Sequence, residues 1–334
     1  MKVNSIEKKD ISFNGFYNSK ALKNILKFAE NNGALFASVT SLALSATARP
    51  AAIFAAPKTD NENKKIACAK SIVSTLLDFG ITFAISLPIV RAVGKINKNP
   101  EKFLKSETIK NLKEDAESLN KSKAYLLANQ MFKLGAGIIV ALPKAVLNVL
   151  GIPFILEAFP QNNNQVTDDK NNITFKGKKS EDKIAALIAK TIDNSVLQKF
   201  SKKHQDSNFP MNINAIKDTT STLIFSAGVY KEKNIDKNRK GALIYNSLIS
   251  TAISIPLSYL ADSLTGKFEK NFVENLKQAN KKDANLQKYI DGFKIAKPIF
   301  IMGLMYYILT PLISTFLAER VDKKFPIKNK SDMK

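Results

Sequence analysis

Six polar residues inside apolar stretches are the ones whose type and spacing could do chemistry. They form two series with a spacing of four residues: Asp78, Thr82 and Ser86 in the first, and Asn246, Ser250 and Ser254 in the second. This spacing places each series on one face of a helix. A polar stripe on matching faces of two helices predicts a polar cavity or ion path between them. The alternative is that small hydroxyl residues let the helices pack closely and hydrogen-bond across their contact.

Asp78 and Lys144 are the two charges deepest in apolar sequence. A charge at the centre of a membrane helix costs at least about 2.5–3.5 kcal/mol, so each is expected to have a partner. We therefore predict an ion pair between them. The alternative for Lys144 is that its long stem extends past Pro143 to the membrane surface, and we expect Arg49 to do the same.

Prolines lie within or near the end of several of these stretches. Four are predicted helix breaks: Pro88, Pro143, Pro256 and Pro311. In transporters such breaks free backbone carbonyls that can line ion sites. Ordinary kinks between packed helices are the alternative.

Six apolar segments must position these side chains, at residues 34–57, 71–90, 134–159, 215–230, 241–261 and 298–318. Five of them reach the roughly 20 residues that cross a bilayer as a helix. The segment 215–230 is weaker, since it contains Lys217 and Asp218. We predict an all-α integral membrane bundle of about six transmembrane helices, multi-pass in location. A soluble bundle with unusually buried helices is the alternative.

The chain also resembles itself. The sequence FAISLPI at 83–89 aligns with TAISIPL at 251–257, and each is followed by a charged, helix-prone connector and another apolar helix. This order predicts two similar three-helix halves. Three crossings in each half would make them inverted repeats, with a site at their interface. The predicted organisation is a flexible segment 1–18, a first half 19–165, a polar linker 166–182, a second half 183–325 and a basic tail 326–334.

The chain of 334 residues has a formal net charge of +22, carried almost entirely by lysine. Nucleic-acid recognition favours arginine, so we predict anionic lipid headgroups as the partner and no nucleic acid. The lysines are nearly balanced between the two sides of a six-helix topology, so they do not predict its orientation. A single Cys68 and a single His204 exclude a disulfide framework and a His-rich metal site.

The sequence contains no phosphate loop, metalloprotease motif or Ser/His/Asp arrangement, so it predicts no enzyme, cofactor or metal. We expect a transporter-like protein with a polar site for a small solute or ion. The alternative is a membrane scaffold or assembly protein that acts through lysine-rich loops and interfacial helices. An amphipathic helix within 181–200 supports that alternative, with an apolar face suited to the membrane interface. This face comprises Ile184, Leu187, Ile188, Ile192, Val196 and Leu197.

Overall fold

The computed structural model describes residues 14–55, 61–114, 116–158, 178–233, 235, 237–314, 317 and 321. In this part of the chain the regular secondary structure is helical and there is no β-strand. The predicted all-α class is therefore confirmed. The predicted tail 326–334 and residues 166–177 of the predicted linker lie outside the described residues.

Up to residue 158 the elements are α1 (Asn14–Tyr17), α2 (Lys20–Asn31), α3 (Gly33–Ala46), α4 (Ala48–Ala55), α5 (Asn61–Lys98), α6 (Pro100–Phe103), α7 (Ser106–Lys113), η1 (Leu119–Lys121) and α8 (Lys123–Ala158). From residue 178 onward they are α9 (Lys178–Ile192), α10 (Ser195–His204), α11 (Phe209–Lys231), α12 (Lys237–Leu264), α13 (Gly266–Ala279), α14 (Leu286–Leu304) and the π-helix η2 (Met305–Leu309).

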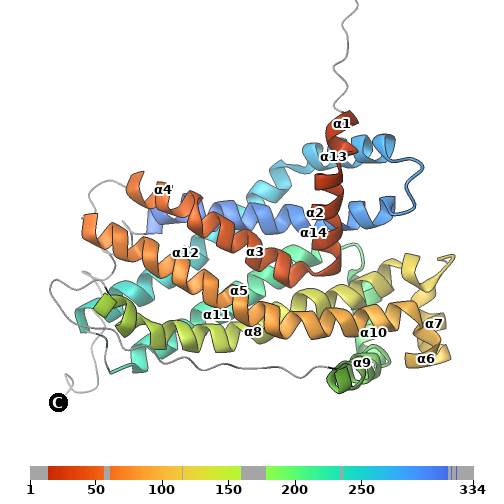
Figure 1. Cartoon of the computed structure of the whole chain (residues 1–334), viewed down its shortest axis with the longest axis horizontal. Helices are drawn as coiled ribbons and strands as arrows, with labels where there is room; N and C mark the ends of the chain where they lie inside the picture. The colour runs from red at the N-terminus through yellow and green to blue at the C-terminus, as the bar shows by residue number, and fades with distance from the viewer. Residues whose placement is uncertain are drawn as a thin grey trace, which may run out of the picture.

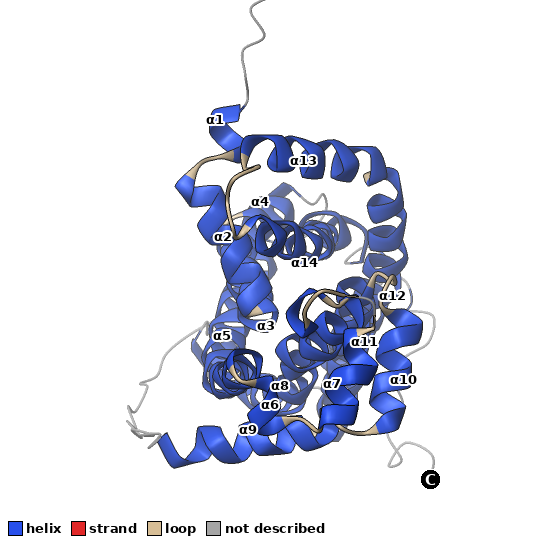
Figure 2. Cartoon of the chain, turned by 90° about the vertical axis from the view of Figure 1, so that its right-hand side faces the viewer, coloured by secondary structure: helices blue, strands red, loops and turns tan. Residues whose placement is uncertain are grey.

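Six helices form a bundle along the long axis of the molecule: α3, α5, α8, α11, α12 and α14 (Figure 1). The amphipathic helices gather at one end of this bundle. Seen from that end, α13 crosses one side of the bundle and α9 crosses the opposite side (Figure 2). Polar connections therefore surround one end of an apolar bundle.

The described residues contain four helices long and apolar enough to cross a membrane: Ser71–Lys98, Lys123–Gly151, Lys240–Leu264 and Leu286–Ser314. Six spans are not found. The segment 34–57 is divided at Thr47 into α3 and α4, because Pro50 has no amide hydrogen with which to continue the α3 ladder. The segment 215–230 lies in α11 and is not among the four.

The outer surface of these helices is apolar. Only 17–39% of the most apolar window of each candidate span is buried inside the protein. Large side chains project outward from all four, including Leu76 on α5, Leu142 on α8, Leu260 on α12 and Phe300 on α14, each at least half exposed. So extensive an apolar exterior is unusual for a water-soluble monomer. It is compatible with a protein that crosses a membrane several times.

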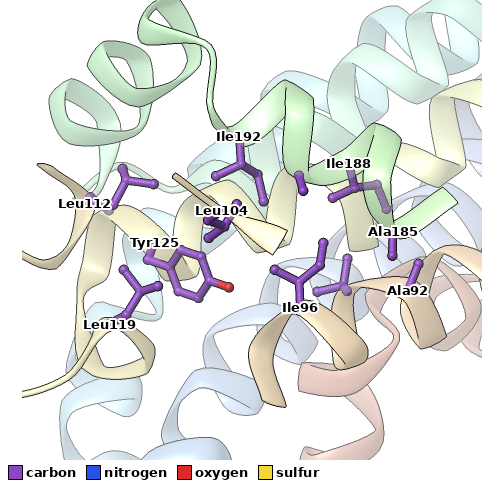
Figure 3. Packing of buried hydrophobic residues seen from close by; sticks show 12 residues of the cluster. Ala92, Ile96, Leu104, Leu112, Leu119, Tyr125, Ala185, Ile188 and Ile192 are labelled. Atoms are coloured by element: carbon purple, nitrogen blue, oxygen red, sulfur yellow. The ribbon is translucent and has the colours of Figure 1, made fainter. Parts of the chain in front are cut away.

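The amphipathic segment 181–200 packs against protein. Its residues belong to α9 and α10, and Ile188 and Ile192 of α9 point toward Ile96 of α5 in a closed hydrophobic cluster (Figure 3). Leu187 and Val196 lie outside this contact and are 66% and 72% exposed. The centre of the apolar face that was expected to suit a membrane interface is therefore covered by α5.

The helices continue through the four prolines predicted to break them. Pro88 lies within α5, Pro143 within α8 and Pro256 within α12. Pro311 follows η2, where the ladder widens to the π form and the Thr310 hydroxyl donates to the Met305 carbonyl at 2.8 Å. The prediction of helix breaks is therefore corrected to one π segment before Pro311.

The two halves run in the same direction along the bundle. The turns α4–α5 and α11–α12 lie at one end, while α3, α8, α11 and α14 all begin at the other (Figure 1). The last described side chains of α8 confirm this, since Val149 packs against Val229 and Ile244 beside the α11–α12 turn, whereas α9 packs on the opposite end of α5. The structure thus differs from the predicted inverted arrangement.

The predicted flexible segment 1–18 also contains structure at its end. Helix α1 packs against α13, where the rings of Tyr17 and Phe272 meet edge to face at 5.2 Å. Asn280 after α13 donates to the Tyr17 carbonyl at 3.0 Å. Residues 1–13 lie outside the described part of the chain.

Candidate functional site

A polar cavity of about 360 Å³ lies inside the bundle, and both halves contribute to its walls. The first half supplies side chains from α3, α4, α5 and α8, and the second from α11, α12, α14 and η2. Four of the residues selected from the sequence line it: Asp78, Lys144, Asn246 and Ser250. The volume falls within the range of small-molecule sites.

The Asp78 carboxylate joins three helices of the first half. Lys144 Nζ of α8 lies 3.0 Å from Asp78 Oδ1 of α5. The Ser38 hydroxyl of α3 donates to the other carboxylate oxygen at 2.7 Å. The Lys144 and Asp78 side chains are 23% and 14% exposed, so both are largely shielded and their attraction is strong. The structure therefore brings the two predicted partners together, and Lys144 does not extend to the surface.

Asn246 of α12 holds the polar wall on another side of the cavity. Its side-chain oxygen accepts hydrogen bonds from Ser250 at 3.1 Å and from Ser314 at 3.0 Å. Nearby, the hydroxyls of Thr222 on α11 and Thr251 on α12 are 2.6 Å apart. These bonds fix the polar wall contributed by α11, α12 and the segment after η2.

The remaining residues of the predicted stripes do not reach the cavity. Thr82, Ser86 and Ser254 are 3%, 0% and 5% exposed and are absent from the cavity lining. The Ser254 hydroxyl bonds to the Thr251 carbonyl of its own helix at 3.4 Å. For these three residues the geometry agrees with close helix packing, the alternative interpretation of the stripe. The four prolines Pro88, Pro143, Pro256 and Pro311 do not line the cavity either.

Arg49 is the principal cavity residue that sequence reasoning placed elsewhere. Instead of extending to the surface, its guanidinium lies 5.4 Å from the ring centre of Tyr306 and 5.7 Å from that of Tyr307. All three residues line the cavity. The two adjacent tyrosines in an apolar segment could have indicated from the sequence that a cation lies nearby. Their π-helical backbone was not visible in the sequence.

Lys217 and Asp218 of α11 complete the charged lining. Their side chains lie 3.4 Å apart, and Lys217 also donates to Asn214 at 3.3 Å. In the sequence these charges only weakened the case that 215–230 crosses the membrane. The structure gives the reason for their presence, since α11 faces the polar cavity.

Further ion pairs hold the amphipathic helices at one end of the bundle. Lys297 is 7% exposed and lies 3.0 Å from Asp262 and 2.7 Å from Glu269. Glu181 of α9 lies outside the candidate spans, and Arg91 and Lys95 beside it lower the pKa of its carboxyl. The Asn285 amide and the Tyr289 hydroxyl lower the pKa of Asp283 to about 2. These groups stabilise the fold and lie away from the cavity.

Comparison with known protein families, curated proteins and solved structures finds no match. The cavity is therefore interpreted from its own geometry and chemistry.

Proposed function

We propose that this chain is a multi-pass membrane protein that binds a small polar solute or ion in the cavity between its two halves and moves it across the bilayer. The observation that carries this proposal is a cavity of about 360 Å³ lined by charged, amide and hydroxyl groups inside a bundle with an apolar exterior. Polar groups at membrane depth are costly and most often mark substrate or ion pathways. The proposed activity is binding and movement, without bond-breaking chemistry.

An internal repeat supports this proposal. Asn32 and Asn208 each cap the helix that enters the bundle, α3 and α11, by accepting from a backbone amide three residues later. Lys64 and Lys240 each donate to a backbone carbonyl ten residues earlier, at 3.0 and 3.2 Å, across the turns α4–α5 and α11–α12. These pairs are separated by the same 176 residues, whereas the FAISLPI and TAISIPL segments lie 168 residues apart, so the contacts favour a different register for the repeat. We infer that the two hairpins are copies of one unit that meet at the cavity.

Repeats that run in the same direction are related by an axis along the bundle. In transporters, relative movement of two repeats about a shared site opens it alternately to either side. We propose the same for the α3–α5–α8 and α11–α12–α14 halves. The lysine-rich ends of the helices are proposed to contact anionic lipid headgroups.

Water access to the cavity tests this function. In a Cys68→Ala background, Ser247→Cys places a thiol in the cavity wall, whereas Ser258→Cys places one on the same face of α12 but fully buried outside it. A small neutral methanethiosulfonate should label position 247 in the reconstituted protein and leave position 258 unlabelled. Equal protection of both thiols would contradict a water-filled site and would favour the scaffold function.

Labelling from the two sides of the membrane tests the topology. With membrane-impermeant reagents, Ala55→Cys and Lys233→Cys should react from one side, because both positions lie at the same end of the bundle (Figure 1). Lys121→Cys, at the other end, should react from the opposite side. Labelling of positions 55 and 233 from opposite sides would instead support inverted halves. Labelling of all three from one side would contradict a bundle that spans the membrane.

A further inference from the structure

The charges in the cavity are not balanced. Its lining contains three cations, Arg49, Lys144 and Lys217, and two carboxylates, Asp78 and Asp218. Asp78 is paired with Lys144 at 3.0 Å, and Asp218 with Lys217 at 3.4 Å. Arg49 is left over, so the described residues of the lining carry one net positive charge.

Arg49 has aromatic neighbours in place of an acidic partner. No carboxylate in the described part of the chain lies within ion-pair distance of its guanidinium, and its Nε is buried without a hydrogen-bond acceptor there. The faces of Tyr306 and Tyr307 attract the cation, with ring centres at 5.4 and 5.7 Å. Such contacts hold the group in place but do not neutralise it, since the rings carry no net charge.

The two tyrosines lie in the π-helix η2. Both line the cavity, and their rings meet edge to face at 5.0 Å. A π-helical turn inside an α-helix is rare and is frequently found at functional sites. Here it presents two rings to one guanidinium.

A guanidinium in this position attracts an anion. Arginine keeps its proton under all physiological conditions, so Arg49 remains a cation in the cavity. Its planar group of N–H donors matches the two oxygens of a carboxylate or phosphate. The uncompensated charge, the aromatic support and the cavity around them all favour the same kind of ligand.

We propose that the cavity binds an oxyanion, a small solute or headgroup with one net negative charge on a carboxylate or phosphate, and that Arg49 is the residue that recognises it. This rests on the proposed solute-binding function. The ion pairs of Asp78 and Asp218 keep the carboxylates from repelling the ligand. Asn246 and the hydroxyl groups opposite are suited to the uncharged polar part of the same ligand.

The charge preference of the cavity tests this proposal. The full-length Cys68→Ala, Ser247→Cys protein in phosphatidylcholine nanodiscs is labelled with neutral, anionic and cationic methanethiosulfonates, and each rate is divided by that of a small free thiol. The anionic reagent should be favoured over the cationic one by roughly tenfold, as expected for one unpaired charge nearby. Arg49→Gln should remove this preference. Arg91→Gln, which removes a surface arginine paired with Glu181, should retain it.

Failure of the two proposals would be distinguishable. If even the neutral reagent fails to label position 247, there is no accessible cavity and the proposed function is wrong. If the neutral reagent labels it but the charged reagents show no anionic preference, the cavity exists and the oxyanion proposal alone is overturned. Arg49→Lys provides a second variant should Arg49→Gln not fold: it should keep the charge preference and weaken anion binding.

Competition identifies the source of the oxyanion. If a free solute is bound, inorganic phosphate or acetate should slow the labelling of position 247 by the neutral reagent, relative to chloride at equal ionic strength. Arg49→Lys should reduce this protection severalfold. Protection that appears only when phosphatidylglycerol is added to the nanodiscs would support the same site with a lipid headgroup as its ligand. No protection by phosphate, acetate or phosphatidylglycerol would overturn the proposal.

Discussion

The Asp78–Lys144 pair allows a quantitative test of the polar core. Asp78→Asn keeps the shape of the side chain and its contact with Ser38, but leaves Lys144 without its closest counter-charge. Lys144→Met keeps an unbranched stem of similar length and leaves Asp78 as an uncompensated carboxylate. The double variant removes both charges and leaves neutral groups in their places.

The magnitude follows from distance and shielding. Two unit charges about 4 Å apart attract by about 4 kcal/mol at the effective dielectric constant of about 20 found near a protein surface. Breaking a fully buried pair by removing one partner costs about 3–5 kcal/mol. Because the side chains of Asp78 and Lys144 are 14% and 23% exposed and face a cavity, the cost should fall below this range. We expect each single variant to lose about 2–3 kcal/mol of unfolding free energy, and the double variant to lose about the same amount.

The assay is a double-mutant cycle of reversible unfolding in detergent micelles. The expected coupling energy is about 2–3 kcal/mol. The pair Lys123–Asp206 is a suitable control, because its atoms lie 2.7 Å apart but both side chains are about 70% exposed, and it should show no measurable coupling. The inferred attraction would be refuted if the stability losses of Asp78→Asn and Lys144→Met summed to that of the double variant within about 0.5 kcal/mol.

Three further predictions test the packing of the amphipathic helices at one end of the bundle. Gly292→Ala should destabilise the protein by about 1–3 kcal/mol, since a Cβ there would overlap a backbone carbonyl of α2. Ile192→Ala should cost about 2–5 kcal/mol because its side chain is fully buried, whereas Leu187→Ala, at a 66% exposed position on the same helix, should cost under about 0.5 kcal/mol. Asp283→Asn should lower the unfolding midpoint of the protein at about pH 5 but not near pH 2. The reason is that the pKa of Asp283 is lowered by folding, so the carboxylate stabilises the fold above its ordinary pKa of 3.8 and this stabilisation is lost as the pH falls through about 2.

The controls for these variants are internal. Gly94→Ala meets nothing within 4 Å and should be neutral or slightly stabilising, since alanine favours the helix. Equal losses at positions 192 and 187 would contradict the packing of α9 on α5. A difference between Asp283→Asn and the native chain that stays constant from about pH 5 to pH 2 would contradict the assigned carboxylate contacts.

Several features followed from local sequence properties. Long apolar segments of regular composition predict helices, and their length predicts candidate spans, because both depend on residues near in sequence. The four-residue spacing around Asp78 predicted a polar helix face for the same reason. The cost of a buried charge predicted that Asp78 and Lys144 would meet, and they lie 3.0 Å apart. Whether they serve a transported solute is still a prediction.

Other features depend on which helices become neighbours. Thr82 and Ser86 share a face with Asp78, yet they are buried while Asp78 opens to the cavity, because the neighbouring helices cover one part of α5 more closely than another. The apolar face of α9 could equally have met lipid, and only its contact with α5 decides otherwise. Periodicity identifies an apolar face but not what covers it.

The sequence by itself determined a helical chain with apolar spans and a few polar residues that had to find partners, because helix formation and burial cost are set locally. Only the tertiary structure decided that α3, α8, α11 and α14 run in the same direction, that polar faces of the bundle enclose one cavity and that Arg49 lies there on Tyr306 and Tyr307. These outcomes depend on contacts between residues far apart in the sequence, and those of Arg49 with the two tyrosines join residues more than 200 positions apart. The physical reason is that a long side chain such as Arg49 goes to whichever environment the packed helices offer it.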